Sequence, residues 1–165
     1  MKRLQTWMSL ASVAICLITP VSSRAESGTM DVLISTVSVL TSIPMGDTTV
    51  TARSGSGTVT FIKSSGGPFV EGASGAAQFA SFSKKSATGF DLEADGLVTF
   101  SAEDTLQLLF KRRTGDLAAG TSGEGTLQLT GGTGRFSGIS GQCKYKVENL
   151  SGNWQVTMAK CQWSR

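Results

Sequence analysis

The chain has 165 residues, which suits one domain with its own core and is short for two. It carries 15 basic and 12 acidic residues, for a formal net charge of +3, and contains no histidine. The lack of histidine excludes Ser-His-Asp and Cys-His nucleophiles and imidazole metal sites. We therefore expect no metal site and no cofactor.

The first residues have the pattern of a secretory signal peptide. Lys2 and Arg3 precede an apolar run, Met8–Val21, that is too short to span a bilayer as a helix. Ser23-Arg24-Ala25 then places small residues at the positions that a signal peptidase reads. These features predict a signal peptide over residues 1–25, a mature domain over residues 26–165, and a periplasmic or secreted location.

Cleavage changes the charge and the cysteine count. Removal of Lys2, Arg3 and Arg24 leaves 15 − 3 = 12 basic residues against 12 acidic ones, so the mature chain is formally neutral. A neutral chain without a basic stripe does not favour a nucleic-acid partner. Of the three cysteines, only Cys143 and Cys161 remain, and in an oxidising compartment such a pair is expected to be bonded.

The mature part reads as all-β. All 20 glycines lie in it, and no segment shows a helical stripe with a 3.6-residue period. β-branched and aromatic residues between turn signals predict short strands. The expected strands are residues 31–43, 48–52, 57–63, 69–71, 77–83, 90–93, 97–101, 105–112, 125–130, 142–148 and 154–163.

Two of these boundaries rest on the segment Asp91–Gly96. Asp95-Gly96 is a strong signal for a tight turn, so we expect a hairpin between 90–93 and 97–101. The spacing of its acids resembles the start of a calcium loop, but Ala102 stands where the bidentate acid is required. A solvated hairpin is therefore favoured over a calcium site.

The strand spacing leaves no room for crossover helices, so the sheet should be mainly antiparallel. We predict a single closed barrel of eight or nine strands rather than a sandwich, because closure removes exposed sheet edges. A membrane-spanning barrel is disfavoured because Tyr145 is the only tyrosine and aromatic girdles are missing.

A glycine-rich motif follows the strand expected at 125–130. It lacks the Gly-Lys-Ser/Thr of a phosphate loop, and a strand rather than a helix is expected after it. We interpret it as a structural connection in which Phe136 plugs one barrel end and Arg135 donates to loop carbonyls. Its residues are Gly131, Gly132, Gly134, Arg135, Phe136, Gly138 and Gly141.

This motif carries a family resemblance. Gly-Thr-Leu-Gln-Leu-Thr (125–130) followed by Gly-Gly-Thr-Gly-Arg-Phe-Ser-Gly (131–138) resembles the hairpin signature of the allene oxide cyclase-like and dirigent-like β-barrels, in particular small secreted bacterial proteins of unassigned function. The resemblance covers residues 125–145 and extends weakly back to residue 57. It implies an eight-stranded antiparallel barrel with a lumen, and it carries over no catalytic residue.

Short basic runs stand at strand ends. Lys84-Lys85 and Lys111-Arg112-Arg113 are interpreted as exposed charges that keep strand edges and loops hydrated.

The spacing of the cysteines fits a final hairpin. If Gly152 centres the turn, Cys143 lies opposite Cys161, since 152 − 143 = 161 − 152. This register places Trp154, Val156 and Met158 on the face of Lys144, Lys146 and Glu148, so a bulge is expected to reconcile the bond with the core.

Three classes of function remain open from the sequence. The first is a non-enzymatic barrel that binds a small apolar molecule or an envelope component. The second is a cofactor-free isomerase or cyclase, which only the family resemblance supports. The third is a structural or interaction module whose lumen is filled by side chains. For the first class, alternation points four candidate ligand contacts inward: Phe61, Phe79, Leu108 and Phe110.

Overall fold

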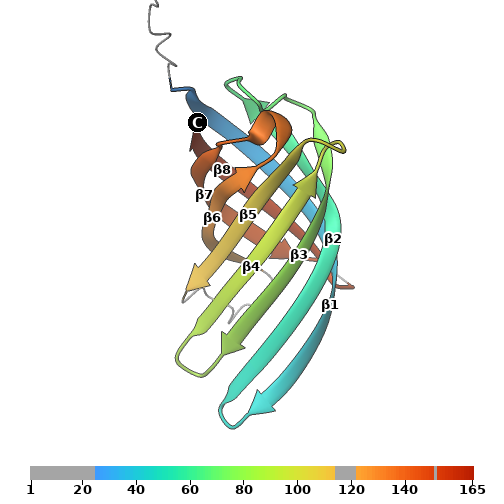
Figure 1. The fold of residues 1–165 in the computed structure, drawn as a ribbon. Helices are drawn as coiled ribbons and strands as arrows, with labels where there is room; N and C mark the ends of the chain where they lie inside the picture. The colour runs from blue at the N-terminus through green and yellow to red at the C-terminus, as the bar shows by residue number, and fades with distance from the viewer. Residues whose placement is uncertain (1–24, 114–121, 151) are drawn as a thin grey trace, which may run out of the picture.

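The chain folds into a closed barrel of antiparallel strands. A computed structural model describes residues 25–113, 122–150 and 152–165. Each strand pairs with the next along the chain, and the last closes onto the first (Figure 1). The predicted fold class is confirmed, with eight strands in the described residues. They are β1 (Ser27–Met45), β2 (Thr48–Ser64), β3 (Ser74–Lys85), β4 (Phe90–Thr99), β5 (Thr105–Arg113), β6 (Ser122–Gly132), β7 (Ser140–Asn149) and β8 (Trp154–Ser164), with a short 3-10 turn, η1 (Gly134–Phe136), before β7.

Three of the predicted boundaries are wrong. The segments 48–52 and 57–63 form one continuous strand, β2, and Asp95-Gly96 lies inside β4 rather than in a turn. Gly96 pairs with Phe79 and Leu108, and a side chain at Gly96 would meet the Phe79 ring at 3.0 Å. Pairing on both sides therefore overrides the local turn signal. Residues 69–71, predicted as a strand, lie in the β2–β3 connection.

The predicted signal peptide lies outside the described residues, apart from Ala25. Among the described residues, no helix has the length and apolar character needed to cross a membrane.

One end of the barrel is closed by five aromatic side chains, which we call the aromatic plug: Phe61, Phe69, Phe100, Phe136 and Trp163. Phe61 and Phe136 have no exposed surface, and Phe69 is 1% exposed. Ring centroids lie 5.1 Å apart for Phe61 and Phe69, and 5.3 Å apart for Phe69 and Trp163. Aromatic pairs at these distances stabilise a core beyond the area they bury. Phe136, which the sequence analysis interprets as closing one end, has its ring buried among these aromatic side chains.

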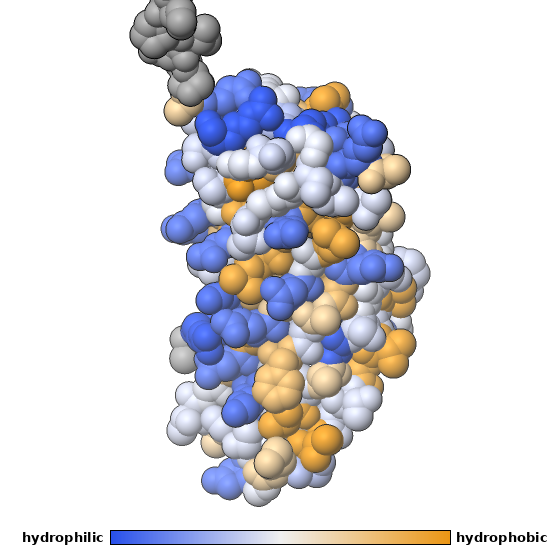
Figure 2. All heavy atoms as spheres, viewed as in Figure 1, coloured by the Kyte–Doolittle hydropathy of each residue, from blue (hydrophilic) through white to orange (hydrophobic). Residues whose placement is uncertain are grey.

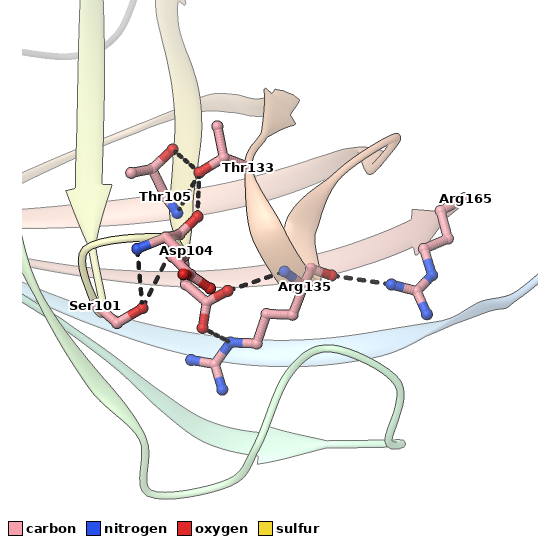
Figure 3. Close-up of polar contacts among 7 residues, drawn as sticks. Ser101, Asp104, Thr105, Thr133, Arg135 and Arg165 are labelled. Atoms are coloured by element: carbon pink, nitrogen blue, oxygen red, sulfur yellow. Dashed lines mark hydrogen bonds and ion pairs between the residues drawn. The ribbon is translucent and has the colours of Figure 1, made fainter.

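The plug is held from outside by polar contacts around η1 (Figure 3). Asp104 accepts a hydrogen bond from the backbone N–H of Arg135 at 2.9 Å, and its other oxygen lies 3.5 Å from Arg135 Nε. Arg165 donates to the carbonyl of Arg135. The expected partner of the Arg135 side chain was a loop carbonyl, whereas the structure gives the Asp104 carboxylate and the faces of Phe100 and Phe136. Gly134 has φ +56°, and a Cβ there would overlap Asp104, which explains the glycine before Arg135.

The predicted disulfide is present. Cys143 on β7 lies directly opposite Cys161 on β8, and their sulfurs are bonded. The turn between the strands uses positive φ at Gly152 and Asn153. The expected bulge is absent, because the β7–β8 register runs without a shift over the pairs that the structure describes. The hairpin instead leaves Trp154 and Met158 about half exposed on the outside, at 51% and 55%.

The outer surface is mixed rather than uniformly polar. Figure 2 shows apolar patches interleaved with hydrophilic ones on one face of the barrel. Exposed apolar side chains near the C-terminal end of β1 include Val39, Ile43 and Met45. Figure 1 shows that the β1–β2 hairpin reaches beyond the other strands at the end opposite the plug.

Candidate binding site

The half of the lumen away from the plug contains two cavities. The inner cavity has a volume of about 110 Å³, and the outer cavity, nearer the strand ends, has about 230 Å³. The two cavities share five lining residues and therefore adjoin. The shared residues are Arg53, Ser81, Leu92, Arg112 and Gln155.

The inner cavity has a largely apolar wall. Phe79 of β3 and Phe110 of β5 meet edge to face, with ring centroids 5.9 Å apart. Phe110 meets Tyr145 of β7 in the same way at 5.7 Å. Ile34 and Ala94 complete this wall from β1 and β4. The cavity can therefore hold an apolar group in contact with aromatic ring edges and faces.

Arg112 continues the row of inward-pointing side chains on β5 toward the end of the barrel opposite the plug. Leu106, Leu108 and Phe110 point into the barrel, and the period-2 alternation puts Arg112 on the same face, where it is only 4% exposed. The guanidinium lies against Gly123 of β6, at which a Cβ would overlap it. Arg112 also lies over the Phe90 ring at 5.2 Å. The prediction that the basic run 111–113 is exposed is thus wrong for Arg112.

The flanking residues of that run do point outward. Lys111 Nζ lies 3.2 Å from Glu93 Oε1, and Arg113 Nη1 lies 3.2 Å from Asp91 Oδ1. These pairs join β5 to β4 across the outer face, where exposed ion pairs contribute little to stability.

Arg53 of β2 is the second cation that bounds both cavities. It is partly buried, and desolvation lowers the pKa of its guanidinium, which nevertheless stays charged at neutral pH. Within the described residues, no carboxylate lies within 4.0 Å of Arg53. A partly desolvated cation is therefore kept at the boundary of the two cavities without an ionic partner in that part of the chain.

The hydroxyl groups of Ser38 and Tyr145 are among the polar groups that line the inner cavity. Ser38 is 6% exposed, and its Oγ has no hydrogen-bond partner within the part of the chain that the structure describes. Burial raises the pKa of the Tyr145 phenol, an effect that the nearby Arg112 charge partly opposes. A buried polar atom without a partner costs free energy, so Ser38 is a natural contact for a bound group.

The structure separates the four predicted ligand contacts into two sets. All four side chains point into the barrel, but only Phe79 and Phe110 line a cavity. Phe61 belongs to the aromatic plug, and Leu108 is packed in the core at 4% exposure. Sequence reasoning missed Arg53 and Arg112. Extending the alternation of Phe61 and Val59 along a continuous β2, and that of Phe110 along β5, would have placed both arginines inside.

The donors of this site favour recognition of an acceptor over acid–base chemistry. Among the described residues that line the cavities, the polar groups are guanidinium, ammonium, hydroxyl and amide, and none is a carboxylate. No group of three or more His, Cys, Asp or Glu residues that could hold a metal ion occurs in the described ranges. The site can therefore supply several hydrogen-bond donors beside an apolar chamber.

The sequence matches no protein-family model and no curated protein. The resemblance to the allene oxide cyclase-like and dirigent-like barrels stays a prediction.

Proposed function

We propose that this protein is an exported, non-enzymatic barrel that binds a small, largely apolar molecule or the apolar part of an envelope component in the open half of its lumen. The observation that carries the proposal is the unequal filling of the barrel. Five aromatic side chains close one end, while the other end keeps two adjoining cavities of about 110 and 230 Å³. Barrels of this strand number are often just filled, or hold one small ligand.

Two features support the exported location. The pattern of residues 1–25 predicts a signal peptide, and the Cys143–Cys161 bond is of the kind that persists in oxidising compartments. Export would also give the barrel access to small molecules outside the cytoplasm.

The lumen rather than the outer surface is the expected binding site, so the test varies lumen volume alone. Ala94 lines the inner cavity, and Ala80 on the adjacent strand β3 is exposed on the outside. The exported, disulfide-bonded protein is titrated with the neutral probe N-phenyl-1-naphthylamine, whose fluorescence rises in apolar surroundings. Its phenyl ring is small enough for the inner cavity, and its naphthalene would extend into the adjoining outer cavity. Ala94→Leu fills the inner cavity and should weaken binding at least tenfold, whereas Ala80→Leu should leave it unchanged.

Native mass spectrometry of protein taken directly from the periplasm completes the test, and a co-purifying small molecule is the expected result. Failure of the wild type to bind the probe, with no co-purifying mass, would overturn the proposal in favour of a structural module. Equal binding by wild type and Ala94→Leu would place the probe on the outer apolar patches and would also contradict it.

A further inference from the structure

The geometry points to a more specific ligand: we infer that the lumen selects a small amphipathic anion, with its acidic group at Arg53 and its apolar part in the inner cavity. This inference rests on the proposed function, because it assigns the ligand class of the same lumen. The ligand is defined by one anionic group, such as a carboxylate, attached to one compact apolar group.

The two cavities are bounded by positively charged side chains. Arg53 and Arg112 bound both cavities, and Lys85 lines the outer one, while no carboxylate lines either cavity in the described residues. Arg112 has contacts of its own, including the Phe90 ring, so Arg53 is the cation available to a ligand. Keeping a guanidinium partly out of water costs free energy, and an incoming anion that accepts two of its N–H donors offsets that cost.

Arg53 lies where the two cavities adjoin. Along β2, Arg53 follows the inward row that begins at Phe61, and it pairs with Leu40 and Ser81. On the plug side of Arg53 the wall carries the aromatic rings of Phe79 and Phe110, together with Ile34. On the other side the hydroxyl groups of Ser42, Thr49 and Thr51 lie among apolar side chains such as Leu40 and Phe90. The cation therefore stands between a chamber with aromatic walls and a mouth that carries hydroxyl groups, which is where the head group of an amphipathic ligand would lie.

Ser38 supplies a buried hydroxyl group on the strand next to that of Arg53. Ser38 Oγ lines the inner cavity, is nine-tenths buried, and has no partner in the described part of the chain. Its O–H can donate to an anion at Arg53, because Ser38 and Arg53 lie on adjacent strands, with Ser38 pairing with Gly55 two residues from Arg53. The Ser38 hydroxyl and the Arg53 guanidinium together suit an acidic group, because its oxygens can accept hydrogen bonds from both.

The volume of the inner cavity limits the size of the apolar part of the ligand. The inner cavity of about 110 Å³ is smaller than the apolar cavities of about 150 Å³ that hold benzene. The apolar part of the ligand is therefore no larger than one ring or a short branched chain. A long acyl chain would have to extend past Arg53 into the outer cavity.

Benzoate and benzamide form a matched probe pair, since they share the ring and differ chiefly in the charge of the head group. Binding is measured by saturation-transfer NMR and by displacement of N-phenyl-1-naphthylamine from the exported protein. We expect benzoate to bind at least tenfold more tightly than benzamide. Arg53→Gln should reduce that ratio to within about threefold, and Ser38→Ala should weaken benzoate more than benzamide.

Arg113→Gln is the control, because it removes an arginine from the outer face and leaves the lumen unchanged. A second readout excludes a structural role: Arg53→Gln should not lower the free energy of unfolding, since it removes a desolvated charge without an ionic partner in the described residues. A large loss of stability would contradict the inference.

The outcomes separate the two proposals. If N-phenyl-1-naphthylamine does not enter the lumen, the proposed function fails. If it enters and Ala94→Leu blocks it, but benzoate and benzamide bind equally, only the present inference fails. If inorganic sulfate displaces the probe as well as benzoate does, the apolar part is not recognised, and the inference is overturned in favour of a simple anion site.

Discussion

The two ends of the barrel obey the same alternation and yet have opposite interiors. At the plug end most inward positions hold apolar side chains, and several of these are large, such as Phe61, Leu127 and Trp163. At the open end the same rows continue with Arg53, Gly55 and Thr157, which leave space or carry polar groups. The difference indicates a division of labour, in which the plug end supplies most of the stability and the open end is free to bind.

The strongest test of this difference between the two ends is to truncate one aromatic side chain in each half of the barrel. Phe136→Ala empties the center of the plug and should lower the free energy of unfolding by about 3 to 5 kcal/mol. Phe79→Ala removes a partly exposed ring from the cavity wall and should cost about 1 to 2 kcal/mol. Urea denaturation followed by circular dichroism measures both. Equal losses would mean that the open half is as tightly packed as the plug.

Reduction of the disulfide tests how much the last hairpin depends on its covalent link. The bond joins residues 18 apart in sequence, so its loss should lower the free energy of unfolding by about 3 kcal/mol through the entropy of the unfolded chain. Urea denaturation with and without reductant provides the measurement, with Cys143→Ala/Cys161→Ala as the second route. A loss below about 1 kcal/mol would show that β7 and β8 hold their register without the bond.

Removal of the polar contacts between Asp104 and Arg135, outside the plug, should have a smaller effect on the free energy of unfolding. Asp104→Ala removes the acceptor of the Arg135 N–H and the ion pair with its side chain, and should cost about 1 to 3 kcal/mol. Asp91→Ala, which breaks an exposed pair with Arg113, should change stability by less than about 1 kcal/mol. Thermal or urea unfolding distinguishes the two variants. Probe binding in the lumen should be the same in both variants. Weaker probe binding in Asp104→Ala alone would show that the plug end influences binding at the open end.

The mildest test is the titration of Tyr145, the only tyrosine of the chain. Burial raises the pKa of its phenol in the folded state above the ordinary value near 10. The unfolded chain then loses this proton first, so the free energy of unfolding is unaffected below about pH 10 and falls as the pH rises through the folded pKa. Phenolate absorbance should show a midpoint above 10 in native protein and near 10 in denaturant. Coincident midpoints would mean that bulk water reaches the inner cavity wall.

Sequence reasoning predicted the architecture well because it depends on repeated local patterns. Leu106, Leu108 and Phe110 alternate cleanly, and Cys143 and Cys161 lie equidistant from Gly152, so β5 and the last hairpin could be placed. It failed where tertiary pairing overrides local chemistry, as at Asp95-Gly96 inside β4. The site was harder still, because an inward arginine breaks the rule that charges lie outside. Only the continuity of β2 and β5 in the folded barrel places Arg53 and Arg112 in the lumen.

The unequal lengths of the strands shape the mouth of the barrel. Beyond Ser38, whose N–H donates to Asn153, β1 pairs only with β2 in the described residues, and this pairing continues to Met45. At about 3.3 Å per residue, those 45 − 38 = 7 residues extend one side of the rim by about 23 Å along the strand. The opening of the barrel is therefore oblique, with its highest side at the β1–β2 hairpin. A molecule that enters over the shorter β7–β8 edge passes Gln155, and it then meets Arg53 on the β2 part of the taller wall.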